Sequence, residues 1–118
     1  MGGKGKGRAV KMETVEGRKF RDVLAGERGT VLALFVADWC GYCRRLREEL
    51  VGAKLGVRKL VEVDVSDEDD PAWEEWRIEL VPTAVMFRAG VEVGRKPPAS
   101  FRGLGVDEVR ALCDAGGS

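Results

Sequence analysis

Apolar residues recur along the chain at spacings that predict five strands. Residues 31–36 are all apolar, and a strand without a polar face is typical of the centre of a sheet that helices cover on both sides. Residues 58–65 alternate between polar and apolar positions, which indicates another strand. Shorter stretches predict strands at 10–15, 81–87 and 91–93, and we expect Arg88, Ala89 and Gly90 to join the last two as a hairpin.

Four further segments carry apolar residues at helical spacing. The first covers residues 19–27, and the second begins at a pair of cysteines near residue 40. The third begins at Pro71 after the acidic run 67–70, because the exposed amides of a helix N-terminus favour negative charge and proline fits the first position. The fourth lies near the C-terminus. The apolar positions of the four helices are, in order, Phe20, Val23 and Leu24; Cys43, Leu46, Leu50 and Ala53; Trp73, Trp76 and Leu80; and Val106, Val109, Leu112 and Cys113.

The order of these elements is β-α-β-α-β-α-β-β-α. It indicates an α/β sandwich with a parallel part and a terminal antiparallel hairpin. A chain of 118 residues suits one domain, which we expect over residues 10–118. Residues 1–9 are rich in glycine and in basic residues and show no periodicity, so we expect a flexible basic tail.

Charge and hydropathy narrow the classes of function. The chain has 20 Lys and Arg residues and 20 Asp and Glu residues, and a net charge of zero argues against a dedicated nucleic-acid-binding protein. No apolar run is long enough to span a membrane or to act as a signal peptide, so we expect a cytoplasmic protein. Asn and Gln are absent while charged residues are abundant, which is a trend of thermophilic proteins.

The chain has no histidine, and this restricts its chemistry. It excludes Ser-His-Asp and Cys-His catalysis and a Cys/His zinc site. There are three cysteines, an odd number, and two of them stand close together in Cys40-Gly41-Tyr42-Cys43. That arrangement is unlike the disulfide framework of a small secreted protein.

The spacing of Cys40 and Cys43 suits reversible disulfide chemistry. The pair follows a buried strand and opens a helix, so Cys40 lies where the free amides and the helix dipole stabilise a thiolate. Cys43 is on the same helix face and close enough to form a disulfide with Cys40. Because Cys43 shares the apolar stripe of Leu46, we expect it to point inward, with Cys40 at the exposed tip. We therefore predict Cys40 as the attacking nucleophile and Cys43 as the resolving thiol.

The segment 39–43, Trp-Cys-Gly-Tyr-Cys after an apolar strand, together with Val81-Pro82-Thr83 at a later strand, resembles the thioredoxin family. The resemblance covers about residues 10–114. It implies a thioredoxin-like three-layer α/β/α sandwich with a central mixed sheet. It also implies a thiol-disulfide oxidoreductase that reduces protein disulfides through Cys40 and Cys43, with no bound cofactor and no metal. In this family the proline that matches Pro82 follows a cis peptide bond beside the dithiol.

The resemblance also implies a surface for substrate. Thioredoxins grip the peptide around a target disulfide with a shallow apolar surface, and the target strand pairs with backbone at the position of Val81. Expected partners are disulfide-containing proteins and an electron donor, either a thioredoxin-reductase-like enzyme or a small thiol. We expect a monomer without a nucleic-acid or membrane partner. The positions that match the surface are Trp39, Gly41, Tyr42, Val65, Val81, Pro82, Gly103 and Leu104.

The sequence departs from the family near the dithiol. Tyr42 stands where thioredoxins usually have a proline, and this leaves the reduction potential open. Leu34 stands where the family has a buried Asp that helps to deprotonate the inner cysteine, and Glu62 aligns with the Lys that accompanies that Asp. Either Glu62 accepts the proton instead or water does. An equal alternative is that Glu62 is a solvated strand residue.

Two other classes of function stay open at this point. In the first class the protein is a metal-binding module: the cysteine pair supplies half of a metal site, and a dimer or carboxylate ligands would have to complete it. In the second class the protein is a non-enzymatic adaptor that docks through the acidic run 67–70 or the basic tail, although an intact cysteine pair argues against loss of redox chemistry. Cys113 is interpreted as a small buried hydrophobic residue.

Overall fold

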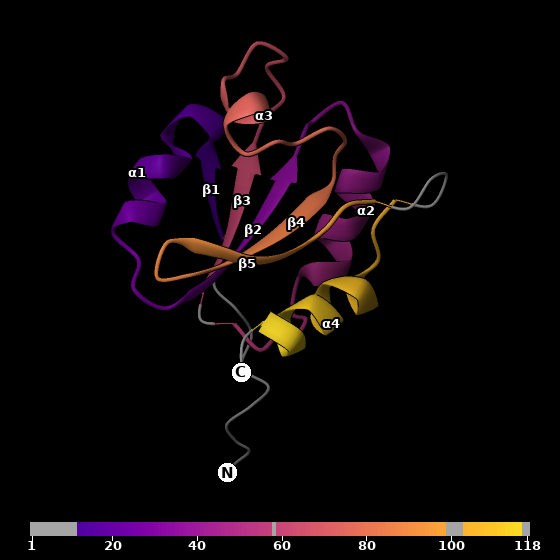
Figure 1. Ribbon diagram of the computed structural model, residues 1–118. Helices are drawn as coiled ribbons and strands as arrows, with labels where there is room; N and C mark the ends of the chain where they lie inside the picture. The colour runs from indigo at the N-terminus through magenta and orange to yellow at the C-terminus, as the bar shows by residue number, and fades with distance from the viewer. Residues whose placement is uncertain (1–11, 58, 99–102, 117–118) are drawn as a thin grey trace.

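Within the residues that the structure describes, the fold is built on one mixed sheet of five strands (Figure 1). The computed structural model describes residues 12–57, 59–98 and 103–116, so the predicted tail lies outside the described residues. The strands lie in the order β1-β3-β2-β4-β5, in which β1, β3 and β2 are parallel and β4 is antiparallel to both β2 and β5. Their bounds are β1 Met12–Glu16, β2 Thr30–Val36, β3 Lys59–Asp64, β4 Thr83–Arg88 and β5 Val91–Lys96.

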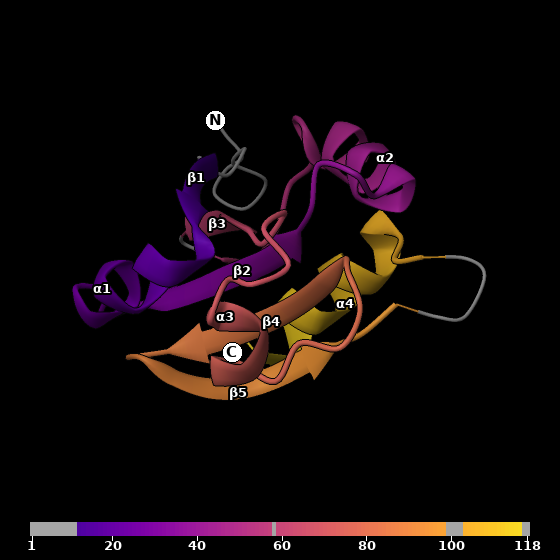
Figure 2. The ribbon, with the colours of Figure 1, turned by 90° about the horizontal axis from the view of Figure 1, so that it is seen from above.

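Helices cover both faces of this sheet (Figures 1 and 2). The helices α1 (Phe20–Ala25) and α3 (Ala72–Glu75) lie on one side, with the short 3-10 helix η1 (Gly17–Lys19), and α2 (Gly41–Leu50) and α4 (Val106–Gly116) lie on the other. The apolar strand β2 contributes side chains to the cores on both faces of the sheet. Leu32, Leu34 and Val36 pack in the core under α2 and α4, and the alternate residues Val31, Ala33 and Phe35 pack in the core under α1 and α3. The predicted three-layer α/β/α sandwich is therefore confirmed.

Three helices are shorter than the apolar pattern predicted. Helix α1, predicted over residues 19–27, spans only Phe20–Ala25. The prediction that α2 continues to Ala53 is wrong, because the helix ends at Leu50 and Gly52 follows with a left-handed φ of +79°. Helix α3 has only four residues, so Leu80 is not part of it. The backbone turns at Arg77, where φ is +53°, and the Ile78 amide then bonds to the carbonyl oxygen of Trp73. In the part of the chain that the structure describes, no helix is long and apolar enough to cross a membrane.

The strands of the hairpin also differ in their ends from the prediction. Strand β4 begins at Thr83, so Val81 and Pro82 precede it, and β5 continues to Lys96. The turn between them has positive φ at both Ala89 and Gly90. This is the backbone of a type I′ turn, whose twist matches that of the two strands.

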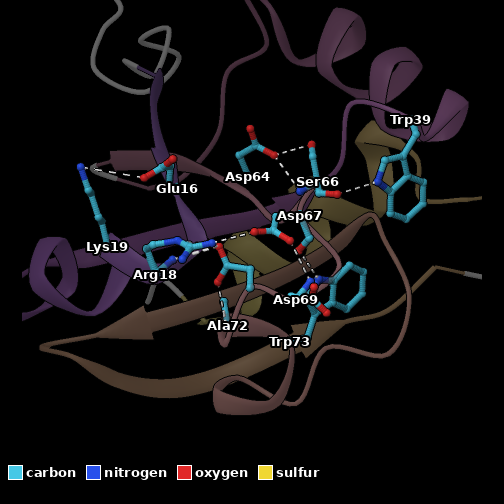
Figure 3. Close-up of polar contacts among 11 residues, drawn as sticks. Glu16, Arg18, Lys19, Trp39, Asp64, Ser66, Asp67, Asp69, Ala72 and Trp73 are labelled. Carbon is cyan, nitrogen blue, oxygen red and sulfur yellow. Dashed lines mark hydrogen bonds and ion pairs between the residues drawn. The ribbon is translucent and has the colours of Figure 1, made fainter.

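Asp70, the last member of the acidic run, ties η1, which follows β1, to the start of α3. Its carboxylate is buried and accepts the amide of Ala72 at 2.9 Å and the amide of Arg18 at 3.2 Å. Arg18 also forms an ion pair with Asp67 at 2.8 Å (Figure 3). A Cβ at Gly17 would lie 2.7 Å from the Asp70 Oδ1 atom, so this approach requires glycine. Asp70 therefore accepts an amide at the N-terminus of α3, as predicted for the acidic run, whereas Pro71 is the N-cap residue and the helix begins one residue later than predicted, at Ala72.

Candidate active site

The two cysteines of the dithiol meet at the N-terminus of α2. Cys40 is the N-cap residue, with φ −102° and ψ 113°, and its Sγ atom accepts the amide of Cys43 at 3.2 Å. The same Sγ lies 3.6 Å from the carbonyl oxygen of Val81. Both thiols are free. The prediction of an exposed Cys40 is wrong: Cys40 is 8% exposed and Cys43 is 3% exposed, because the segment before β4 covers the end of the helix.

The pKa of the Cys43 thiol lies well above its ordinary value. Burial is the largest cause, followed by a hydrogen bond with Cys40, and the nearby charges of Cys40 and Glu62 act in the same direction. A hydrogen bond with the backbone of Ala37 opposes them. Cys43 therefore keeps its proton at neutral pH, and it needs a proton acceptor before it can act as a nucleophile.

The residues predicted to grip substrate differ in their exposure. Trp39 and Tyr42 are exposed beside the dithiol, and the Trp39 indole donates a hydrogen bond to the carbonyl oxygen of Ser66 at 2.9 Å (Figure 3). Gly41 is exposed, whereas the side chains of Val65 and Leu104 are fully or almost fully buried. A substrate could therefore reach Val65 and Leu104 only through their backbone. The contacts of all these residues with substrate stay a prediction.

The Val81–Pro82 peptide bond is cis, which is the geometry expected from the sequence. Val81 is partly buried and its carbonyl oxygen faces the Cys40 sulfur. Gly103 lies directly against Tyr42, which stands between the two cysteines in the sequence: a Cβ on Gly103 would lie 2.8 Å from the ring. Two remote segments, at 81–82 and 103, thus contact the segment 39–43 that carries the dithiol.

A cleft of about 200 Å³ lies behind Cys43, and Glu62 forms part of its wall. Glu62 is only 3% exposed, so the alternative of a solvated strand residue is wrong. One carboxylate oxygen accepts the Thr14 hydroxyl at 3.0 Å, and the other lies 3.2 Å from the Nε atom of Arg47. Arg47 belongs to α2, one helical turn after Cys43. A charged, paired carboxylate and the buried thiol therefore share one cavity.

Comparison with known proteins identifies the family to which this site belongs. The thioredoxin family model matches residues 11–102, which is most of the chain. The chain belongs to the thioredoxin family. It is 34% identical over 86 residues to the thioredoxin of Chlamydia trachomatis, an alignment that covers 71% of this chain and 81% of that protein. The family's activity, thiol-disulfide exchange through a redox pair of cysteines without a bound cofactor, is therefore assigned to Cys40 and Cys43.

Solved thioredoxin structures share the fold. Thioredoxin f2 of Chlamydomonas reinhardtii superposes with a TM-score of 0.71 at 20% identity, covering 89% of this chain and 95% of its own. A mutant thioredoxin of Halobacterium salinarum superposes with a TM-score of 0.67 at 26% identity, covering 97% of each chain. These similarities agree with the sheet order and the two helix layers described above.

The family resemblance implies a buried Asp at the position of Leu34 of β2, and this chain has a buried carboxylate at Glu62 of β3 instead. Leu34 and Glu62 pair in register on the two neighbouring strands. The carboxylate is therefore displaced by one strand and still reaches the cavity behind the inner cysteine. The sequence suggested Glu62 but missed Arg47 and Thr14. Arg47 could have been found, because a residue four positions after Cys43 lies on the same side of the helix.

The metal-module interpretation gains no support from the arrangement of side chains. Among residues 12–57, 59–98 and 103–116, no three His, Cys, Asp or Glu side chains are grouped so that they could hold a metal ion. Cys113 is fully buried in the core under α2 and α4, as expected. Burial raises the pKa of its thiol to about 12, with a smaller contribution from Asp114.

Proposed function

We propose that this thioredoxin-family oxidoreductase acts as a reductant of protein disulfides, with Cys40 as the attacking thiol and Cys43 as the resolving thiol. One observation carries the assignment of roles: the Cys40 sulfur accepts the Cys43 amide at the N-terminus of α2, where a thiolate gains stabilisation. The Cys43 thiol, whose pKa is raised, remains protonated until it is needed.

The proposed reaction has two exchange steps. The Cys40 thiolate attacks a substrate disulfide, forms a mixed disulfide and releases the first substrate thiolate. Cys43 then loses its proton and attacks the Cys40 sulfur, which breaks the mixed disulfide and releases the second thiolate. The substrate gains two electrons and the cysteine pair becomes a disulfide. We propose Glu62 as the acceptor of the Cys43 proton, because both groups line the same cleft; water in that cleft is the competing acceptor.

Substrate would lie over the exposed Trp39 and Tyr42 side chains and beside Gly41 and the Gly103–Leu104 backbone. Its strand would pair with the backbone next to Val81, and the backbone at Val65 and at the buried Pro82 would complete the surface. Electrons would return from a thioredoxin-reductase-like enzyme or a small thiol. The proposal also includes a monomer that acts in the cytoplasm and uses neither nucleic acid nor membrane.

The direction of the reaction is tested by the reduction potential of the cysteine pair. It is measured by equilibration with dithiol and glutathione buffers, with Cys40→Ser as the control that cannot form the disulfide. A value near about −270 mV supports a reductant, and a value between about −180 and −120 mV would assign an oxidase or isomerase instead. The absence of any Cys40–Cys43 disulfide at every potential would contradict redox function altogether.

The roles of the two cysteines are tested by trapping. Cys43→Ser is expected to accumulate a mixed disulfide with an oxidised protein substrate, because attack still occurs and resolution does not. Cys40→Ser is the matched control and is expected to trap nothing. The opposite result would reverse the two assigned roles.

A further inference from the structure

Arg47 is a charged residue of the cleft to which the mechanism above gives no role. It lies on α2 one turn after Cys43, and its side chain reaches back across the cleft to β3. Its Nε atom is 3.2 Å from the Glu62 Oε2 atom, and its own side chain is 56% exposed while that of Glu62 is 4% exposed. The guanidinium therefore lies at the mouth of the cleft, with the carboxylate behind it.

The pairing of Arg47 with Glu62 stands out among the titratable groups that line the cleft, which are Asp38, Cys43, Arg44, Arg47, Glu62 and Asp64. Asp64 accepts both the amide and the hydroxyl of Ser66, at 2.8 Å and 2.5 Å. Arg44 donates to the backbone oxygen of Asp38, and the Asp38 residue is exposed. Arg47 is thus the cation that balances the buried Glu62.

Glu62 is held at two points. Thr14 of β1 donates to Oε1, and Arg47 of α2 contacts Oε2. Each carboxylate oxygen has two lone pairs, so one remains free on each atom to accept a proton. Among the contacts of residues 12–57, 59–98 and 103–116, loss of the Arg47 contact would leave the buried carboxylate with one hydrogen bond and no ion pair, which is unfavourable.

We propose that Arg47 is a positioning residue for resolution: its guanidinium fixes the Glu62 carboxylate in the cleft and balances its charge, so that Cys43 can give up its proton. The inference rests on the proposed function, because it concerns the second exchange step. The proton passes from the Cys43 sulfur to a Glu62 oxygen, directly or through cleft water. The electron pair left on sulfur forms the bond to Cys40 and displaces the substrate thiolate, and Glu62 later returns the proton to solvent.

The electrostatics of Cys43 support this role. The charge of Glu62 is one of the causes that raise the pKa of the Cys43 thiol. Without Arg47, that charge would act uncompensated on Cys43, or Glu62 would take up a proton and cease to be an acceptor. Both changes move the resolution step to higher pH.

The test measures the two exchange steps separately in the full chain. The reduced protein is mixed in a stopped-flow spectrometer with dithiobis-nitrobenzoate, a disulfide whose released thiolate is coloured, between pH 6 and pH 9. The first release reports attack by Cys40 and the second reports resolution by Cys43. In Arg47→Met we expect the second phase to slow about tenfold near neutral pH and its pH profile to shift upward by about one unit, with the first phase unchanged.

Arg45→Met is the matched control. It removes the same charge from the same helix, but Arg45 is exposed and forms its ion pair with Glu49 of α2 at 3.8 Å, away from the cleft. We expect its second phase to match that of the unaltered protein. Arg47→Lys, which keeps the charge, is expected to restore part of the rate and serves if Arg47→Met does not fold.

Glu62→Gln decides whether Arg47 acts through Glu62. We expect Glu62→Gln to slow the second phase, and the double variant with Arg47→Met to be no slower than Glu62→Gln alone. Equal second phases in Arg47→Met and Arg45→Met would overturn the inference, and so would independent, multiplying effects of Arg47→Met and Glu62→Gln. A missing second phase in the unaltered protein would instead contradict the proposed function itself.

Discussion

At the scale of single residues, Gly103 approaches Tyr42 so closely that a side chain at position 103 has no room. Gly103 has a left-handed φ of +67°, and an added Cβ would lie 2.8 Å from the Tyr42 ring and 2.9 Å from its Cβ. We predict that Gly103→Ala lowers the free energy of unfolding by about 2–4 kcal/mol, about 1 kcal/mol from the backbone and the rest from overpacking. Urea unfolding at equilibrium measures this change.

Gly90→Ala separates the cost of the left-handed backbone from the cost of overpacking. Gly90 also has a positive φ, +82°, but no atom lies within 4 Å of an added Cβ. We therefore expect this variant to lose only the backbone contribution of about 1 kcal/mol. Gly103→Ala should become equally mild in a Tyr42→Gly background, and an unchanged loss there would show that Tyr42 is not the obstacle.

The sequence could predict which residues meet at the dithiol better than it could predict how deeply those residues are buried. The spacing of Cys40 and Cys43 fixes the helix turn that they share, and the family resemblance supplied Pro82. The burial of Cys40 and Glu62 could not be predicted, because it depends on segments that are remote in sequence: Val81 beside Cys40, and Thr14 with Arg47 around Glu62.

At the scale of elements, the β4–β5 hairpin contains a residue that its turn disfavours. Ala89 has a φ of +51° and is followed by Gly90, and a type I′ turn favours Asn-Gly at these two positions. We predict that Ala89→Asn raises the free energy of unfolding by about 0.5–1 kcal/mol, because Asn tolerates a left-handed backbone at lower cost. Thermal and urea unfolding measure the change.

Ala111→Asn is the matched control for the hairpin. Ala111 is exposed in the middle of α4, where Asn is a poorer helix former than Ala, so the same substitution should lower the free energy of unfolding by about half a kcal/mol. Equal changes of the same sign at the two positions would contradict the explanation by turn geometry.

The length of α3 shows what the apolar pattern cannot distinguish. Trp73 and Trp76 at helical spacing predicted a longer helix, yet one helical turn followed by a reversal at Arg77 still directs both side chains toward the core. Trp76 packs edge-on against Phe20 and Phe87, and Arg95 of β5 donates to its carbonyl oxygen at 2.9 Å. These tertiary contacts take the place of further helical hydrogen bonds.

At the scale of the whole molecule, the sequence of a single strand, β2, was enough to predict that helices cover both faces of the sheet. The unbroken apolar run of β2 requires cover on both faces, and the two cores on either side of the sheet supply it. What this pattern left open is the chemistry of each core. One core is aliphatic and aromatic, whereas the core under α2 and α4 contains all three cysteine side chains.

Because the thiols in that core are buried, the free energy of unfolding of the reduced protein changes with pH in the alkaline range. Burial raises the pKa of Cys113 from its ordinary value of 9.0 to about 12. Above pH 9 the unfolded chain loses this proton while the folded chain keeps it, so the unfolded state binds fewer protons and the free energy of unfolding falls as pH rises. The contribution is complete below pH 9 and is lost between pH 9 and pH 12, at about 1.4 kcal/mol per pH unit.

Cys113→Ala isolates this contribution, because Cys43 and every other titrating group are left in place. The variant will be less stable than the unaltered protein at pH 7, since the smaller side chain leaves a void in the core. We predict that the difference between the two proteins shrinks by about 1.4 kcal/mol for each unit above pH 9, as measured by urea unfolding under a reducing agent. Two curves that stay parallel from pH 8 to pH 11 would show that Cys113 titrates alike in the folded and unfolded chains, and so is not held neutral by the core.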